Sequence, residues 1–562
     1  MTSPTVSETP AAELDRAVED LTAGAKTWSA LSLTERLALV KTTYASIESA
    51  AAEWAEAGIV AKGTPRGPLE GEEWMSGPYA TLAGFGAIID SLEKLAAGTS
   101  PLAGIKSGTA PGGRTTFRML PSSLQEFTLF NGFTADLWLE PGISADQARA
   151  HAGLGANKPG VNGGVGLVLG AGNITAIGPL DVLYELIASN RASILKINPT
   201  FAGLIDAYAT AFAPLIEANL LRVVNGGAET GGYLTQHPGI CHVHITGSGV
   251  THDAIVWGGG DKTGEPVLRT PITSELGGVS PIIVVPGTWS KADLRYQAEH
   301  VATQRLHNGG HNCIAGQALI LSSDWAQREE FLAVLRDVLD TLPARAPWYP
   351  GTDRKLASAA SSYPEAEQHG GRVLIEVNET TSQDLLTTEY FGPVLGFTSL
   401  PGTGIEFLRA AVDFANTKLD GTLGASLIVA PADRKRMGSA FDDAIADLHY
   451  GTIGINVWSA IGFLLPSVSW GAYPGNTLEA VGSGIGIVHN SHLVDNVERS
   501  VLTGPFRPFP RSVLNGEIAL SPKPSWFVTA RSAKSTAQKL TGYAAAPSWL
   551  EMPAIFAAAF RA

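Results

Sequence analysis

Residues 164–197, GVGLVLGAGNITAIGPLDVLYELIASNRASILKI, carry the pattern that decides the fold. Residues 165–169 form a short, uncharged apolar run, as expected of a buried parallel strand. A turn at 170–173 follows, then a helical stretch over 180–190 and a second buried strand over 192–197. Strand, turn and helix go on alternating to residue 246, which predicts a parallel sheet covered by helices on both faces.

The same alternation resumes farther along the chain. A second α/β unit is expected to begin near residue 286, with a buried strand over 317–321. Residues 11–95 have the composition and spacing of helices, and 123–141 have the alternation of paired strands. The sequence therefore predicts an α/β fold with two doubly wound α/β domains.

The composition excludes several classes of protein. The 562 residues include 39 Lys and Arg against 53 Asp and Glu, a formal net charge of −14, so bulk nucleic acid is a poor partner. Two cysteines, Cys241 and Cys313, are too few for a disulfide framework and fit a reducing cytoplasm. Residues 448–478 lack Asp, Glu, Lys and Arg, but their glycines and prolines indicate a buried strand and a loop rather than a transmembrane helix.

Two residues are candidates for covalent chemistry. Cys313 lies in HNGGHNCIAG, residues 307–316, where the glycines fix the backbone closely. A thiolate is a strong nucleophile when its pKa is lowered, although a lone cysteine is more often a small buried apolar residue. Glu275, in TSELGGVSP, is a general base if partial burial raises its pKa, or otherwise an exposed carboxylate in a turn.

Two further motifs follow buried strands. Asn173 ends the turn GAGN and can donate its amide to an oxyanion, or equally cap a helix. Gly247 and Ser248, in ITGSG, allow a helix N-terminus to approach a pyrophosphate. Each motif alone is weak evidence for function.

The order of the motifs resembles that of the aldehyde dehydrogenase superfamily over about residues 14–488. The matching motifs are ILK (194–196), TGS (246–248), ELGG (275–278), Cys313, EYFGPV (389–394) and GSGIG (482–486). The resemblance implies that Cys313 is the nucleophile, that Asn173 and the backbone N–H of Cys313 form the oxyanion hole, and that Glu275 is the general base. It also implies a site for NAD or NADP, and no metal. The cofactor-binding residues would be Lys196, Gly247, Ser248, Glu389 and Phe391.

The function that the resemblance implies is oxidation of an aldehyde to a carboxylic acid with NAD or NADP, through a thiohemiacetal and a thioester on Cys313. An acyl-CoA-linked dehydrogenase or reductase is the first alternative, although a water-activating Glu275 favours hydrolysis. A thiol hydrolase or acyltransferase that uses Cys313 and His311, and a non-catalytic relative, are the others. The family also implies a homo-oligomer.

Several positions depart from the family pattern and suggest an outlying subfamily. Ala171 and Gly172 replace a Pro-Trp pair, Pro199 replaces a Glu that favours NAD, and His311 replaces a Gln. His311 is expected to hydrogen-bond the loop rather than to activate the thiol. Two aromatic residues, Trp458 and Phe463, are interpreted as core residues in preference to the walls of a substrate tunnel.

The resemblance also implies a division of the chain into segments. The expected segments are a disordered tail over 1–12, a nucleotide-binding domain over 13–285 with a β-hairpin oligomerisation arm at 125–139, a catalytic thiol domain over 286–470, a return to the nucleotide-binding and arm region over 471–500, and a C-terminal extension over 501–562.

Overall fold

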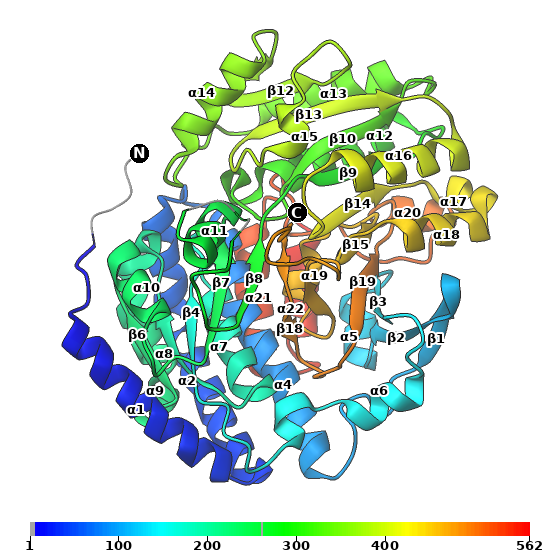
Figure 1. Ribbon diagram of the computed structural model, residues 1–562. Helices are drawn as coiled ribbons and strands as arrows, with labels where there is room; N and C mark the ends of the chain where they lie inside the picture. The colour runs from blue at the N-terminus through cyan, green and yellow to red at the C-terminus, as the bar shows by residue number, and fades with distance from the viewer. Residues whose placement is uncertain (1–5, 260–261, 263) are drawn as a thin grey trace.

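Two large β-sheets organise the computed structural model, which describes residues 6–259, 262 and 264–562 (Figure 1). The smaller sheet has the order β17-β8-β7-β4-β5-β6 and is parallel except at β17. Its strands are β4 (Val165–Leu169), β5 (Ala192–Lys196), β6 (Leu221–Val224), β7 (His242–Gly247), β8 (Ile272–Leu276) and β17 (Gly484–Ile485). The parallel sheet predicted from residues 164–246 is therefore confirmed.

The larger sheet has the order β1-β2-β3-β19-β15-β14-β9-β10-β13-β12-β11. Strands β19 to β12 run parallel, and antiparallel strands close both ends. The strands are β1 (Ser107–Ala110), β2 (Arg114–Leu120), β3 (Thr134–Leu139), β9 (Ser280–Val284), β10 (Gly316–Ser322), β11 (Glu367–His369), β12 (Arg372–Glu376), β13 (Val394–Leu400), β14 (Gly424–Ile428), β15 (Thr452–Ile455) and β19 (Val497–Thr503). A separate pair joins β16 (Ser469–Gly471) to β18 (Ile487–Asn490).

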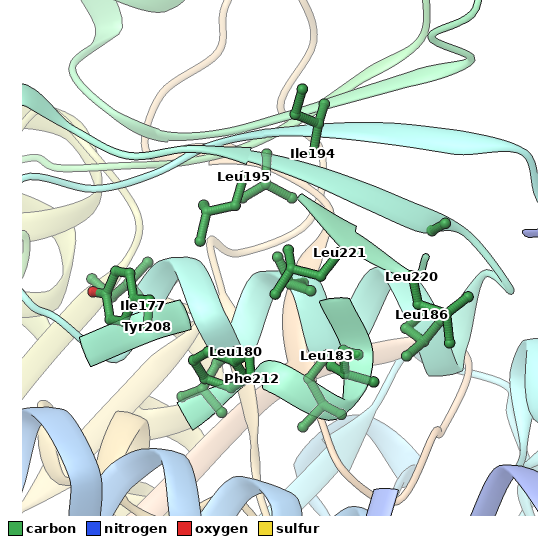
Figure 2. Packing of buried hydrophobic residues seen from close by; sticks show 14 of the residues in the cluster. Ile177, Leu180, Leu183, Leu186, Ile194, Leu195, Tyr208, Phe212, Leu220 and Leu221 are labelled. Carbon is green, nitrogen blue, oxygen red and sulfur yellow. The ribbon is translucent and has the colours of Figure 1, made fainter. Parts of the chain in front are cut away.

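Helices cover the smaller sheet on both faces. They are α1 (Ala11–Ala30), α2 (Leu33–Lys62), α4 (Ala80–Ala96), α7 (Ile177–Ala188), α8 (Ile205–Ala211), α9 (Ala213–Glu217), α10 (Ala228–Thr235) and α11 (Gly249–Trp257), with α3 (Glu70–Trp74) and a π-turn η1 (Met75–Tyr79) between α2 and α4. Helix α6 (Ala145–His151) lies instead beside β2 of the larger sheet, where Arg149 lies over the ring of Phe117. Figure 2 shows Leu180 and Leu183 of α7 pointing away from the strands that carry Leu195 and Leu221, and Leu180 packs against Gly84 of α4. Leu180 and Leu183 are three positions apart, so they share one face of the helix.

The long helix α2 begins and ends where its sequence predicts. Ser32 accepts a hydrogen bond from the backbone N–H of Glu35, whose carboxylate bonds back to Ser32, and Gly63 ends the helix in the left-handed conformation with φ 56°. Such caps satisfy backbone groups that a helix terminus leaves unpaired. The cap at Gly63 fixes the position of Lys62, which reaches the candidate active site.

The helices around the larger sheet include the one that leads to Cys313. They are α12 (Lys291–Leu306), α13 (Arg328–Thr341), α14 (Thr352–Ser362), α15 (Asp384–Thr387), α16 (Gly404–Lys418), α17 (Pro431–Met437), α18 (Ser439–Asp447) and α19 (Ile461–Leu464), with a 3-10 turn η5 (His307–Gly310) after α12. Residues 448–478 contain β15, α19 and β16, which confirms a buried strand and loop there. Within the described residues, no helix is both long and apolar enough to cross a bilayer.

The structure corrects the predicted arm. Residues 125–139 do not form a hairpin, because α5 (Leu124–Leu129) precedes the single strand β3. The hairpin lies earlier, in β1 and β2. The alternation of apolar residues had suggested two strands, but Ser123 accepts a hydrogen bond from Glu126 N and caps a short helix.

Three expected boundaries also differ. Strand β9 belongs to the larger sheet, so the smaller unit ends before residue 280 rather than at 285. The boundary at 501 falls inside β19. Residues 1–5 of the expected tail lie outside the described residues, whereas Glu8 is fixed by hydrogen bonds from Gly227 N and Thr230 N, both 3.0 Å long.

The segment after β19 is folded onto the rest of the chain. It contains α20 (Arg511–Leu514), α21 (Ala533–Ala545) and α22 (Met552–Ala559), and α21 packs against α3 and α4 (Figure 1). Lys534 pairs with Glu70 at 2.7 Å, and Arg507 and Arg511 pair with the buried carboxylate of Asp293 at 2.9 and 2.6 Å. Ion pairs to two different helices hold the segment in place.

Candidate active site

Cys313 lies on a tightly turned loop between α12 and β10. The preceding residues Asn308, Gly309 and Gly310 have φ values of 57°, 68° and 83°. A side chain on Gly310 would approach the carbonyl oxygen of Gly392 to 2.5 Å. Only glycine allows this contact, so the sequence of the loop fixes where the thiol stands.

A buried arginine joins this loop to the loop that carries Glu389. The guanidinium of Arg305 donates to the carbonyl oxygens of Gly310 at 3.0 Å and Tyr390 at 3.1 Å, and also to that of Gly392. Planar guanidinium groups hold several acceptors in one fixed geometry. Arg305 therefore sets the distance between the nucleophile loop and the segment around Glu389.

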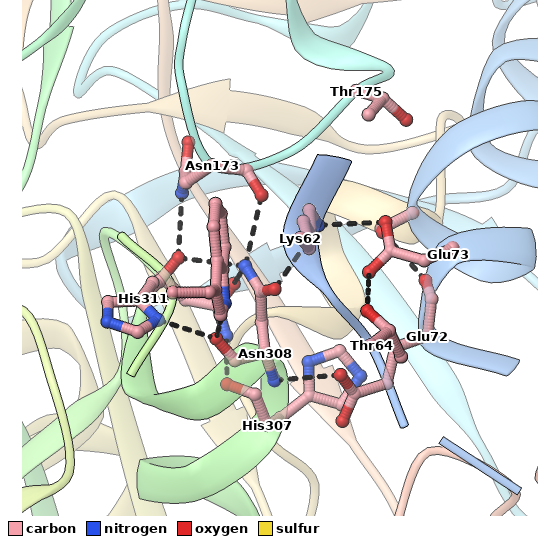
Figure 3. A network of polar contacts seen from close by, with 12 residues as sticks. Lys62, Thr64, Glu72, Glu73, Asn173, Thr175, His307, Asn308 and His311 are labelled. Carbon is pink, nitrogen blue, oxygen red and sulfur yellow. Dashed lines mark hydrogen bonds and ion pairs between the residues drawn. The ribbon is translucent and has the colours of Figure 1, made fainter. Parts of the chain in front are cut away.

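A polar network positions Asn173 beside the nucleophile loop (Figure 3). The side-chain amide of Asn173 donates to the carbonyl oxygen of His311 at 3.0 Å, and the amide of Asn308 donates to the carbonyl oxygens of both residues, also at 3.0 Å. Lys62 donates to Asn308 Oδ1 at 3.2 Å and pairs with the buried Glu73 at 2.9 Å. One hydrogen of the Asn173 amide is thus used for positioning, and the other remains to meet a substrate.

The thiol of Cys313 lies close to the carboxylate of Glu275, at the end of β8, and each group shifts the pKa of the other. Burial raises the pKa of Glu275 to about 7. Burial and the neighbouring Glu275 hold the pKa of the Cys313 thiol well above its usual value. A carboxylate that titrates near neutrality and contacts the thiol can accept its proton.

A second buried carboxylate faces the same space. Burial raises the pKa of Glu389 to about 7, against the opposing effect of Arg305. The Glu389 carboxylate lies so close to Gly277 that a Cβ there would be 2.1 Å from Oε1. Within the described residues, Oε1 of Glu389 has no hydrogen-bond partner. A buried, unpaired acceptor of this kind indicates a place for a donor on a ligand.

One cavity of about 400 Å³ brings most of the predicted residues together. Its lining includes Asn173, Gly247, Ser248, Glu275, Cys313, Glu389 and Phe391. Lys196 is absent from that lining; it stands at the end of β5, where burial lowers the pKa of its ammonium. Ser248 caps α11 by accepting a hydrogen bond from Thr251 N at 3.2 Å, so it marks a helix N-terminus at the cavity.

His311 stabilises the loop, as predicted, and does not contact the thiol. Its Nδ1 lies 2.9 Å from the carbonyl oxygen of Asn308, and its Nε2 lies 2.9 Å from Thr352 Oγ1. Burial lowers the pKa of His311 to about 3, so the ring is neutral. Both ring nitrogens are occupied, which leaves the ring no role as a base for Cys313.

A smaller, mostly apolar cavity of about 50 Å³ lies on the other side of Cys313. It shares Asn173, Glu275 and Cys313 with the first cavity. Its apolar walls include Met75, Ile314, Trp458, Phe463, Trp470 and Trp526. The interpretation of Trp458 and Phe463 as core residues was therefore incomplete, because both also line this cavity.

The comparison with known proteins agrees with this geometry. The model of the aldehyde dehydrogenase family matches residues 164–466. The chain belongs to the aldehyde dehydrogenase family. Among curated proteins, it is 28% identical over 283 residues to a hydroxyisobutyraldehyde dehydrogenase of Mycolicibacterium austroafricanum, in a match that covers 49% of this chain. That match covers 51% of the relative, so the chain spans about half of the relative's length.

Solved structures of the family share the fold. An NADP-dependent glyceraldehyde-3-phosphate dehydrogenase from Bacillus halodurans, in complex with NADP, has a TM-score of 0.59 at 16% identity, covering 89% of this chain and 92% of that one. Aldehyde dehydrogenase C from Pseudomonas syringae, in complex with NAD+ and octanal, has a TM-score of 0.59 at 18% identity, with coverages of 89% and 90%. At these identities the likeness establishes the fold of this chain.

Sequence reasoning missed the residues that support the site. Arg305, Lys62 and Trp526 carry no local motif, because each acts through partners far away in the chain. The glycine pair at 309–310 was a usable signal for the tight loop, and Asn308 beside it completes the left-handed run. Nothing local distinguishes Trp526 from the other tryptophans of the chain.

Proposed function

We propose that this protein oxidises an aldehyde to a carboxylic acid with NAD or NADP, through a covalent intermediate on Cys313. One observation carries the proposal: a single cavity contains the Cys313 thiol, the Asn173 amide and the Glu275 carboxylate. The family membership supports the same reaction. Each group stands where charge changes during attack on a carbonyl, which is the arrangement that lowers a barrier.

The residues divide the reaction among them. Glu275 takes the proton of the Cys313 thiol as the sulfur attacks the aldehyde carbon. The free hydrogen of the Asn173 amide and the backbone N–H of Cys313 stabilise the oxyanion of the thiohemiacetal. Loss of hydride from that carbon leaves a thioester on Cys313. Glu275 releases that proton to solvent and then takes a proton from the water that attacks the thioester. The C–S bond breaks, the acid leaves, and the sulfur of Cys313 recovers its proton from Glu275.

The remaining lining residues fit a nicotinamide dinucleotide, which when bound accepts the hydride. Glu389 presents an unpaired buried oxygen that a ribose hydroxyl can satisfy. Ser248 and Gly247 lie at the N-terminus of α11, which favours a pyrophosphate. We assign Phe391 to the nicotinamide side of the cavity and Lys196, at the neighbouring strand end, to the adenosine side.

The apolar cavity supports a substrate class. Its position next to Cys313 suits an aldehyde whose apolar chain or ring leaves the solvent. The Pseudomonas syringae relative was crystallised with octanal, an aldehyde of this kind. Hydrolysis is preferred to transfer of the acyl group to CoA, because Glu275 contacts the thiol and titrates near pH 7.

The arrangement of the chain supports three broader proposals. The smaller sheet would bind the nucleotide and the larger sheet would carry the thiol loop. The protein would act as a homo-oligomer, as the family resemblance implies. A reducing, cytoplasmic environment would suit the two free cysteines, Cys241 and Cys313.

The test is formation of reduced nicotinamide, followed by absorbance, with purified protein, NAD or NADP, and aldehydes of increasing chain length. Cys313→Ala should abolish turnover, whereas Cys241→Ala, at an exposed cysteine outside the cavity, should leave it unchanged. If neither nucleotide binds and no aldehyde is oxidised, the proposal is wrong. Thiol-dependent ester hydrolysis without nucleotide would then favour a hydrolase.

A further inference from the structure

A second, larger cavity lies on the outer side of α12, apart from the proposed catalytic site. Its volume is about 740 Å³, and it shares no lining residue with the 400 Å³ cavity around Cys313. Its walls come from residues 65–69, α12, the segment 341–347, residues 370–372 and the C-terminal segments 523–531 and 561–562. A volume of this order is typical of pockets for small ligands.

The inner wall of this cavity is basic. Arg345 is mostly buried and pairs with Glu72 at 2.5 Å. Arg372 is 7% exposed, and its guanidinium donates to the carbonyl oxygens of Leu339, at 2.9 Å, and Pro343. Among the described residues, Arg372 has no carboxylate within ion-pair distance. A nearly buried cation held only by neutral acceptors is costly, and an anion in the cavity would offset that cost.

The outer wall adds further positive charge. Arg66, Arg295 and Lys523 line it together with Glu299, the one acidic side chain in the lining as far as the chain is described, but these three cations are already paired with carboxylates of Glu56, Glu70, Glu299 and Asp337. Arg531 and Arg561 line it too, and neither forms an ion pair with another described residue. Together with Arg372 they leave an excess of positive charge in this cavity, in a chain with a net charge of −14. A concave surface of one sign focuses its field and attracts ligands of the opposite sign.

We propose that this cavity binds a small phosphorylated molecule that carries at least two negative charges. The deep Arg345 and Arg372 fix the position of the anion, and the rim residues Arg531 and Arg561 close over it. Arginine suits this role because its planar fork donates two hydrogen bonds to one phosphate. The C-terminal segment then has a binding function that does not depend on the proposed oxidation.

The experiment measures binding rather than turnover. Inorganic pyrophosphate is titrated calorimetrically into the full chain at low salt, without nucleotide. The test variant is the double substitution Arg531→Gln and Arg561→Gln. The matched control is Arg16→Gln and Arg409→Gln, which removes two exposed arginines outside the cavity.

The expected result is binding to the wild type and to the control, at least tenfold weaker binding to the test variant, and weaker binding in 0.5 M salt. Two results would overturn the proposal. They are no binding of pyrophosphate to the wild type, and equal weakening in both variants, which would indicate a non-specific effect of charge.

Discussion

Substitution of Glu275 by Gln should stabilise the free protein relative to the wild type at neutral and alkaline pH. At acidic pH the variant and the wild type should be equally stable. Folding raises the pKa of this carboxyl from an ordinary 4.5 to about 7. Between those values the folded chain binds a proton that the unfolded chain has lost, so wild-type stability falls as pH rises. The shift of roughly 2.5 pKa units corresponds to at most about 3 kcal/mol, since one unit is about 1.4 kcal/mol.

Glutamine keeps the size of the side chain and removes the charge. The difference in stability between Glu275→Gln and the wild type should therefore be near zero around pH 4.5, grow up to about pH 7 and stay constant above it. Thermal unfolding without cofactor, at pH 5, 6, 7 and 8, should show a melting temperature difference that increases by a few degrees across this range. The exposed Glu379→Gln should show no such trend. A difference that does not change with pH would refute the claim that ionised Glu275 is costly in the folded protein.

Three further substitutions probe the substrate and cofactor sites. Asn173→Ala should lower kcat about 100–1,000-fold, the usual effect of losing an oxyanion donor, whereas the exposed Asn162→Ala should not change kcat. Trp526→Ala should raise kcat/KM for eight-carbon aldehydes over four-carbon ones several-fold. Trp526 stands between the 50 Å³ cavity and a neighbouring apolar cavity of about 60 Å³, and an unchanged ratio would contradict that role. Glu8→Gln should raise the ratio of kcat/KM with NADP to kcat/KM with NAD several-fold, because the Glu8 carboxylate lies near Lys196 and repels a phosphate. Equal effects on both nucleotides would contradict this role of Glu8.

The elements that sequence predicted well are those whose pattern is local. The strand expected over 165–169 is β4, residue for residue, because a buried parallel strand between two turns leaves an unbroken apolar run. The order of motifs also predicted which side chains would meet: Asn173, Glu275 and Cys313 line one cavity. Asn173 and Glu275 lie at the carboxyl ends of parallel strands β4 and β8, on one edge of the smaller sheet, whereas Cys313 comes to them from the loop before β10 of the larger sheet.

The elements that sequence predicted poorly depend on distant partners. Strand β9 follows directly after the smaller sheet in the chain but pairs with β10 and β14, and no local pattern states which sheet a strand joins. The alternation at 125–139 fits a hairpin, yet a cap at Ser123 makes its first part a helix. The buried pair of Lys62 and Glu73 supports Asn308 across more than 200 residues of sequence, which no window of sequence reveals.

The C-terminal segment is best understood as part of the fold rather than as an addition to it. Its first residues complete β19, a strand between β3 and β15, so a cut at 501 would open the larger sheet. Ion pairs of Arg511 to α12 and of Lys534 to α3 then fix two points of the segment. Between them, Trp526 closes the apolar cavity beside Cys313, and Lys523 and Arg531 line the basic cavity. A short stretch of chain thus forms walls of two cavities with opposite chemistry, and this explains why it is fastened at two points: movement of either wall would change the other.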